Sequence, residues 1–190
     1  MTRTVEVLID IPWIVLVAYW LFGALNTRKT ATRESFLSRY SVMFLVVAGY
    51  VFLFSHDANI GLLARHFVPR STGSLTAGIV LTWLGITLAL WARYHLGQYW
   101  SGRITLKEDH QLIRTGPYAR LRHPIYSGIL LAMAGTALTV GQWRCVLGFC
   151  LVMAAYCIKA KKEEQLLSGQ FGDAFAEHRR HTGFLLPRFR

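Results

Sequence analysis

Two pairs of charged residues that lie far apart in the sequence could together form a polar binding site. Arg122 and His123 have no acidic neighbour, because residues 110–162 contain neither Asp nor Glu. The first carboxylates after that stretch are those of Glu163 and Glu164. Each pair borders an apolar run, so two antiparallel helices joined by a short loop would bring all four side chains to one end of a hairpin.

Such a site would suit a ligand that carries both signs of charge and a ring. S-adenosylmethionine is one, because its carboxylate favours Arg or His, its ammonium group favours an acid, and its adenine favours aromatic or apolar walls. Arginine presents a fork of donors that matches a carboxylate, which lysine cannot do. A pyridine dinucleotide phosphate would also use the arginines but would gain less from paired acids. In a purely structural alternative, the arginines anchor the chain at the membrane surface and pair with the glutamates.

The elements that must position these residues are predicted to be membrane helices. Hydrophobic residues make up 53% of the chain, and the mean hydropathy is +0.34. A hydrocarbon core of about 30 Å needs roughly 20 helical residues, and shorter spans are tolerated beside longer neighbours. The sequence predicts five spans, the last two in a tight hairpin, built on apolar runs at residues 7–25, 40–55, 75–92, 125–140 and 145–158.

The basic residues predict how these spans are oriented. With five spans, only Arg3, Arg65, Arg70 and Arg144 of the 21 Lys and Arg residues fall on the side of the N-terminus. Positively charged segments stay in the cytosol, so we expect the N-terminus outside and the C-terminus in the cytosol. The net charge of +11 then reflects topology and attraction to anionic lipids rather than nucleic-acid binding.

The chain is expected to form a single membrane domain over residues 1–190. Residues 1–72 would hold the first two spans and their loops, and residues 73–190 would hold the cofactor-binding and catalytic part. Residues 163–181 are predicted to form an amphipathic helix that lies along the protein or membrane face. The apolar residues that recur at helical spacing in this tail are Leu166, Leu167, Phe171 and Phe175.

Two motifs resemble a known enzyme family. "GPYARLRHPIYSG" over residues 116–128 and "EEQLLSGQFG" over residues 163–172 together resemble the isoprenylcysteine carboxyl methyltransferase family and, more distantly, the phospholipid N-methyltransferases. The resemblance extends over residues 91–187. It implies an all-α integral membrane enzyme with about five transmembrane helices, whose S-adenosylmethionine pocket faces the cytosol, here at a bacterial inner membrane.

The resemblance also implies roles for individual residues. Arg122, Glu163 and Glu164 would be catalytic, and Lys159 would approach the substrate. No metal is expected, because His178 and His181 have no third ligand nearby. Phe175 and His178 stand where tyrosines are often seen in the family's tail. The residues that would bind the cofactor are Arg103, His110, Leu112, Ile113, Gly116, Tyr118, His123, Pro124, Ile125, Tyr126 and Glu163.

The reaction implied by the resemblance is methyl transfer to a hydrophobic, membrane-borne acceptor, first of all the carboxylate of a prenyl-type compound. A carboxylate is ionised near pH 7 and needs no general base. A water-poor site favours its reaction with a sulfonium methyl, because the two charges cancel. The expected partners are this lipophilic substrate and membrane lipids, not nucleic acid.

Two other reactions remain open. Lipid amine N-methylation would need a base such as Glu164 or His123 to deprotonate the amine. A membrane reductase that uses NADPH is the second, since membrane sterol reductases share a related hairpin with an Arg-His-x-x-Tyr-x-Gly motif. Pro124 and the paired glutamates favour the methyltransferase.

Overall fold

The computed structural model describes residues 3–24, 36–97 and 112–189, and these residues form a helical protein without strands. Three short 3-10 turns, His56–Ala58, Gly61–Ala64 and Gly116–Ala119, lie between the longer helices. The predicted all-α class is therefore confirmed for this part of the chain. The five α-helices are α1 (Arg3–Ala24), α2 (Phe36–Phe54), α3 (Thr72–Leu96), α4 (Pro124–Val140) and α5 (Trp143–His181).

Three of these helices are long and apolar enough to cross a membrane. They are the Arg3–Gly23 segment of α1, all of α3, and α5, whereas the apolar parts of α2 and α4 are shorter. Large hydrophobic side chains point outward from α1 and α2, for example Phe22 at 80% exposure and Phe44 at 71%. Apolar surface of this extent is expected where a helix faces lipid.

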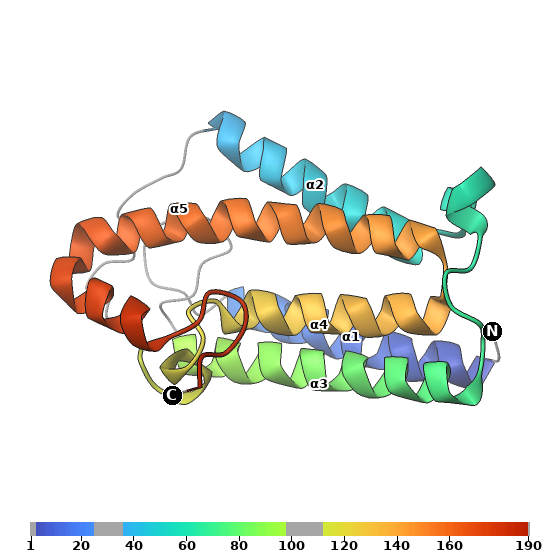
Figure 1. The fold of residues 1–190 in the computed structure, drawn as a ribbon, viewed down its shortest axis with the longest axis horizontal. Helices are drawn as coiled ribbons and strands as arrows, with labels where there is room; N and C mark the ends of the chain where they lie inside the picture. The colour runs from blue at the N-terminus through green and yellow to red at the C-terminus, as the bar shows by residue number, and fades with distance from the viewer. Residues whose placement is uncertain (1–2, 25–35, 98–111, 190) are drawn as a thin grey trace.

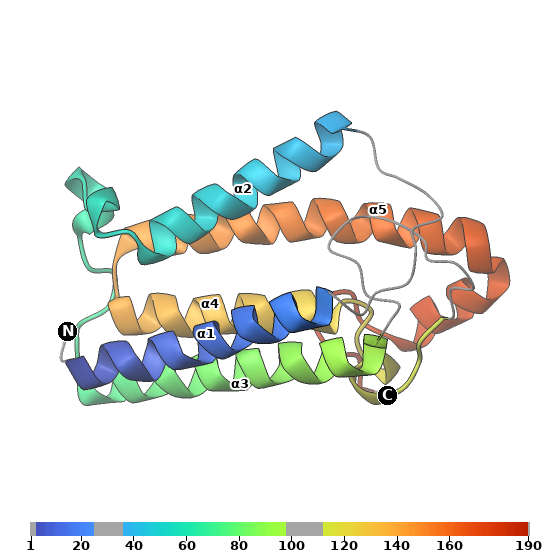
Figure 2. The same ribbon diagram turned by 180° about the vertical axis from the view of Figure 1, so that it is seen from behind.

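The helices form two closely packed pairs. In Figures 1 and 2, α4 lies with α3 and α1 on one side, and α5 lies with α2 on the other. A Cβ atom added to Gly85 of α3 would lie 2.3 Å from the backbone nitrogen of Ala132 in α4. One added to Gly49 of α2 would lie 2.7 Å from the carbonyl oxygen of Gly148 in α5. Glycine is needed at both crossings because only its missing side chain lets the backbones approach this closely.

Aromatic side chains fill the space between the two pairs. The Trp13 ring of α1 meets Tyr50 and Phe54 of α2 edge to face, with centroids 5.7 and 5.6 Å apart. The Trp13 indole also donates a hydrogen bond to the Thr136 hydroxyl of α4 (3.1 Å). A buried indole usually finds such a partner, so this contact fixes α1 against both pairs.

The α4–α5 hairpin has the local signals that its sequence predicts. Pro124 occupies the first turn of α4, and Gly141 ends α4 in the left-handed conformation (φ 73°). Arg144, at the start of α5, is only 3% exposed and donates to the carbonyl oxygens of Phe52 and Leu53 at the end of α2. A cation at the C-terminal end of a helix is favourable because unpaired carbonyls gather there.

The tail over residues 163–181, predicted to form an amphipathic helix, is the last part of α5. α5 continues without interruption beyond the apolar run and bends at Gly172, whose backbone is not helical (φ 47°, ψ −121°). The segment after the bend folds back toward the start of α4, as Figure 1 shows. Phe175 and His178 become buried there. This part of the tail therefore contributes to the interior of the protein.

Candidate active site

A network of charged and aromatic side chains joins the start of α4 to α5. Arg122 Nε donates to Glu164 Oε1 at 2.5 Å, and His123 Nε2 lies 3.2 Å from the same oxygen. His123 Nδ1 lies 3.6 Å from Glu163 Oε2, and the Tyr126 hydroxyl donates to Glu163 Oε1 at 2.6 Å. The hairpin thus brings together the two charged pairs, as the sequence predicts.

The helix geometry explains why both glutamates take part. Successive residues of an α-helix point about 100° apart, so Glu163 reaches Tyr126 while Glu164 reaches Arg122. His123 is the residue just before α4, and its ring stacks on that of Tyr126 with centroids 5.6 Å apart. The imidazole is thereby held between the two carboxylates.

The C-terminal strap, residues 182–189, is hydrogen-bonded to the backbone of residues 120–122, just before α4. The Arg122 amide donates to the Gly183 carbonyl (2.9 Å), and the Gly183 amide donates to the Arg120 carbonyl (3.0 Å). The Phe184 ring packs edge to face on His123, with centroids 5.2 Å apart. Sequence analysis missed this strap, because its partners are mainly backbone atoms that no residue pattern reveals.

The charged residues of this network, Arg122, His123, Glu163 and Glu164, lie outside the apolar runs at residues 125–140 and 145–158. Electrostatics favours their charged forms. Burial would lower the pKa of His123, but its hydrogen bonds to Glu163 and Glu164 outweigh this and raise the pKa. Burial would likewise raise the pKa of both glutamates, yet each pKa is lowered. His123 acts on both carboxylates, Lys159 and Tyr126 add to the effect on Glu163, and Arg122 adds to that on Glu164. Glu163 and Glu164 are therefore ionised near pH 7.

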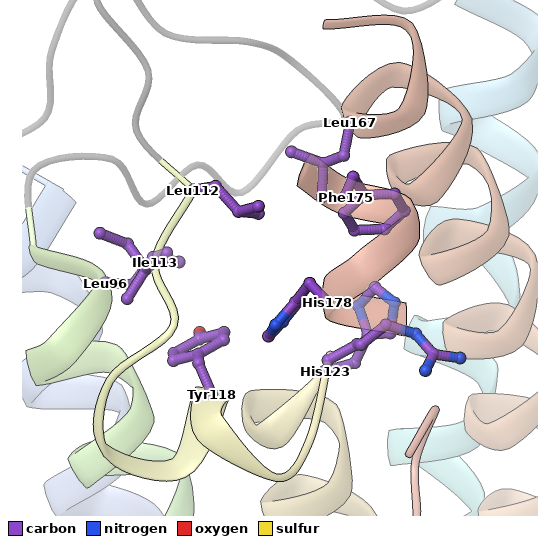
Figure 3. A pocket seen from close by; sticks show the side chains of 9 residues that line it. Leu96, Leu112, Ile113, Tyr118, His123, Leu167, Phe175 and His178 are labelled. Carbon is purple, nitrogen blue, oxygen red and sulfur yellow. The ribbon is translucent and has the colours of Figure 1, made fainter. Parts of the chain in front are cut away.

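A cleft opens beside this network, with apolar and aromatic walls (Figure 3). Its volume is about 60 Å³, enough for a few waters or for part of a larger ligand. One wall comes from the end of α3 and the segment before α4, and the other comes from α5 on both sides of its bend. The lining residues are Leu96, Leu112, Ile113, Tyr118, Arg122, His123, Leu167, Phe175 and His178.

The predicted site residues fall into distinct places. Leu112, Ile113 and Tyr118 line the cleft, and Pro124 and Ile125 are buried in the first turn of α4. The remaining predicted residues lie as follows: Gly116 packs against His95, Lys159 Nζ lies 5.6 Å from the Tyr126 ring centroid, and Arg103 and His110 lie outside the described residues.

Four lining residues were not predicted to belong to the site: Leu96 and Leu167, and the pair Phe175 and His178 after the bend. Phe175 was assigned to the apolar face of a surface helix, and His178 was considered only as a metal ligand. The only sequence signal for them was their position where tyrosines are often seen in the family's tail. The bend at Gly172, which turns both side chains toward the cleft, is what places them in the site.

Comparison with known proteins identifies the segment that holds the network. The model of the isoprenylcysteine carboxyl methyltransferase family matches residues 78–169, from α3 into α5. This segment belongs to that family. The match includes both charged pairs and Tyr126, so the network described above lies within the family's own region. The bend at Gly172, His178 and the C-terminal strap follow it.

Three relatives extend this comparison. The chain is 32% identical over 115 residues to the protein-S-isoprenylcysteine O-methyltransferase of Schizosaccharomyces pombe. The aligned residues cover 59% of this chain and 49% of that enzyme. It is 28% identical to the cobalt-zinc-cadmium resistance protein CzcN of Cupriavidus metallidurans, over 82% of this chain and 67% of the relative. It is also 28% identical to the nickel-cobalt-cadmium resistance protein NccN of Alcaligenes xylosoxydans xylosoxydans, over 82% of this chain and 68% of the relative. The chain thus spans about half the length of the yeast enzyme.

Proposed function

We propose that this protein is an integral membrane methyltransferase that uses S-adenosylmethionine to methylate a hydrophobic acceptor. The observation that supports this most strongly is the network of Arg122, His123, Glu163 and Glu164 beside an aromatic cleft. The family match over residues 78–169 and the yeast relative's name support the reaction type. The carboxylate of a prenyl-type compound is the acceptor we favour. CzcN and NccN are named for metal resistance, and these names specify no acceptor.

The side chains of the network fit the chemical groups of S-adenosylmethionine. That cofactor carries an ammonium group, a carboxylate and a flat base, and it supplies an activated methyl group on a sulfonium sulfur. Glu163 is the group that binds the ammonium, because its side chain is 24% exposed and its pKa is lowered. Arg122 supplies guanidinium donors for a carboxylate, and His123, whose two ring nitrogens face Glu163 and Glu164, adds positive charge beside them. Tyr118 and Phe175 supply aromatic walls.

The remaining residues of the network orient these groups and exclude water. Glu164 accepts hydrogen bonds from both Arg122 and His123, so it holds the two cations in place. Lys159 lies one helical turn before Glu163 and is positioned to attract an anionic acceptor. Burial of the network lowers the local dielectric, which favours a reaction that cancels opposite charges.

We further propose that this end of the bundle faces the cytosol of a bacterium. In Figure 1 the chain termini lie at opposite ends of the bundle, and the C-terminus lies at the end that holds the site. This arrangement agrees with a N-terminus outside and a C-terminus inside the inner membrane. A polar cofactor would then enter from the cytosol, while a lipophilic acceptor would enter from the bilayer. Residues 73–190 would form the catalytic part, and residues 1–72 would complete the membrane domain.

Transfer of an isotopically labelled methyl group tests the proposal. The purified protein is incubated with methyl-labelled S-adenosylmethionine and a bacterial lipid extract, and the lipid fraction is analysed by mass spectrometry. We expect label in a lipid that releases methanol on treatment with base, because a methyl ester is cleaved by base. Label that resists base would instead favour lipid amine N-methylation.

Matched variants link the transfer to the site. Glu163→Gln removes the charge from the network, and Glu177→Gln removes a charge from an exposed pair with Arg180 and His181. We expect the first variant to lose transfer and the second to retain it. Absence of label from every lipid with the wild-type protein, together with tight binding of NADPH and none of S-adenosylmethionine, would refute the proposal in favour of a reductase.

A further inference from the structure

Two buried polar side chains face each other across the cleft. Tyr118 belongs to the 3-10 turn before α4 and is 8% exposed, and His178 belongs to α5 after the bend at Gly172 and is 7% exposed. Figure 3 shows both side chains pointing into the same space from opposite walls. The cleft therefore has polar atoms on both sides, although most of its walls are apolar.

Neither side chain is hydrogen-bonded to another described residue. The other polar residues of the cleft, Arg122 and His123, are bound to Glu164. By contrast, the His178 ring and the Tyr118 hydroxyl have no such bond within residues 3–24, 36–97 and 112–189. Neither residue has a fully buried polar atom without a partner, so their polar atoms are open to the cleft, where a ligand or water can bond to them.

Both groups are uncharged near pH 7. Burial, followed by the nearby charges of Arg114 and Arg122, lowers the pKa of His178 to about 4, and Glu164 opposes this only in part. Burial and the charge of Glu163 raise the pKa of Tyr118. A neutral imidazole and a phenol can each donate and accept a hydrogen bond. This pair is therefore suited to an uncharged polar group and not to an ion.

The other residues of the cleft restrict which uncharged polar group can bind between Tyr118 and His178. Leu96, Ile113 and Phe175 form apolar and aromatic walls, whereas the charged lining residues Arg122 and His123 are neighbours in the chain just before α4. A flat heterocycle with donors and acceptors along its edge satisfies both conditions. Of the parts of S-adenosylmethionine, only the adenine base has this character.

We propose that His178 binds the adenine base of S-adenosylmethionine from the side opposite Tyr118, while the amino-acid end lies toward His123 and Glu163. This inference rests on the proposed function and deepens it. It gives the α5 segment beyond the family match a direct role in binding. It also assigns the two ends of the ligand to different residues, which a binding experiment can separate.

Two ligands and two variants test this assignment. S-adenosylhomocysteine carries both ends of the cofactor, and 5′-methylthioadenosine carries the base without the amino-acid end. Affinities for both are measured by calorimetry on the full chain in lipid nanodiscs. We expect His178→Phe, which keeps a ring of similar size, to weaken both ligands by the same factor, about tenfold. We expect Glu163→Gln to weaken S-adenosylhomocysteine and leave 5′-methylthioadenosine unchanged.

Further outcomes separate this inference from the proposed function. If wild-type protein binds S-adenosylhomocysteine and His178→Phe binds both ligands equally well, the adenine assignment is wrong and the proposed function stands. If His178→Phe weakens S-adenosylhomocysteine alone, His178 contacts the amino-acid end and the assignment is again wrong. If wild-type protein binds neither ligand, both proposals fail.

A third variant guards against loss of folding. His178→Gln keeps a donor and an acceptor, so it is expected to recover most of the affinity for both ligands. If His178→Gln melts like wild type yet binds as weakly as His178→Phe, hydrogen bonding to the base is ruled out. The melting temperature of each variant is compared with that of the wild type, which distinguishes a loss of affinity from a loss of fold.

Discussion

Replacement of Glu163 by glutamine should weaken cofactor binding strongly while the fold persists. The Glu163 carboxylate lies 2.6 Å from the Tyr126 hydroxyl and 3.6 Å from His123 Nδ1. Glutamine keeps an oxygen that can accept from Tyr126 but removes the negative charge. A hydrogen bond to a charged group contributes about 1.5–3 kcal/mol, so the loss of one to the ligand's ammonium should cost about 2 kcal/mol. That corresponds to a loss of affinity of roughly 30-fold.

Calorimetric titration with S-adenosylhomocysteine measures this effect directly. Glu177→Gln provides the matched control, because Glu177 is 51% exposed and pairs with the exposed Arg180 and His181 of its own helix. The control should bind as wild type does. If Glu163→Gln lowers the melting temperature but binds with unchanged affinity, the network is a membrane-surface anchor and not a cofactor site.

Three further perturbations test the fold and its electrostatics. The pKa of His123 is raised, so its stabilising contribution is complete below about pH 6.5 and is lost as the pH rises through the raised value. The melting temperature of His123→Gln should therefore fall below that of wild type most clearly at acidic pH, and a constant difference up to pH 10 would contradict this. Gly85→Ala should destabilise the protein by about 1–3 kcal/mol, because the added Cβ would meet the backbone of α4. Gly169→Ala is the control, because Gly169 faces open space, and it should melt no lower than wild type. Equal melting temperatures of the two variants would contradict the close packing of α3 and α4. A reporter fused after Arg190 should be active in the cytosol, and a periplasmic signal would reverse the proposed topology.

The end of the hairpin at which the network lies could be predicted from the sequence. Charge-free runs define the last two helices, Pro124 marks where one begins, and a short loop forces the pair to be antiparallel. The absence of acids over residues 110–162 left Glu163 and Glu164 as the first downstream partners for Arg122 and His123. Opposite charges at the ends of two helices joined by a short loop therefore predict which side chains pair in the folded protein.

The bend in α5 could not be predicted in the same way. A glycine within a helical pattern is common, and the spacing of apolar residues continues across Gly172. Its positive φ depends on how the tail packs against the segment before α4, which is tertiary information. For this reason His178 was expected on a surface helix although it lines the cleft. Arg144 was likewise expected in an outer loop but is buried at the start of α5. Its partners are the carbonyl oxygens of Phe52 and Leu53, and a charge pattern in the sequence does not reveal backbone partners.

A structure of the protein in lipid nanodiscs with S-adenosylhomocysteine bound would test the central claim most directly. The ligand's amino group should lie within hydrogen-bond distance of Glu163, and its adenine should lie between Tyr118 and His178. A bound ligand remote from the α4–α5 junction, with Arg122, His123 and both glutamates still paired only to one another, would contradict the account.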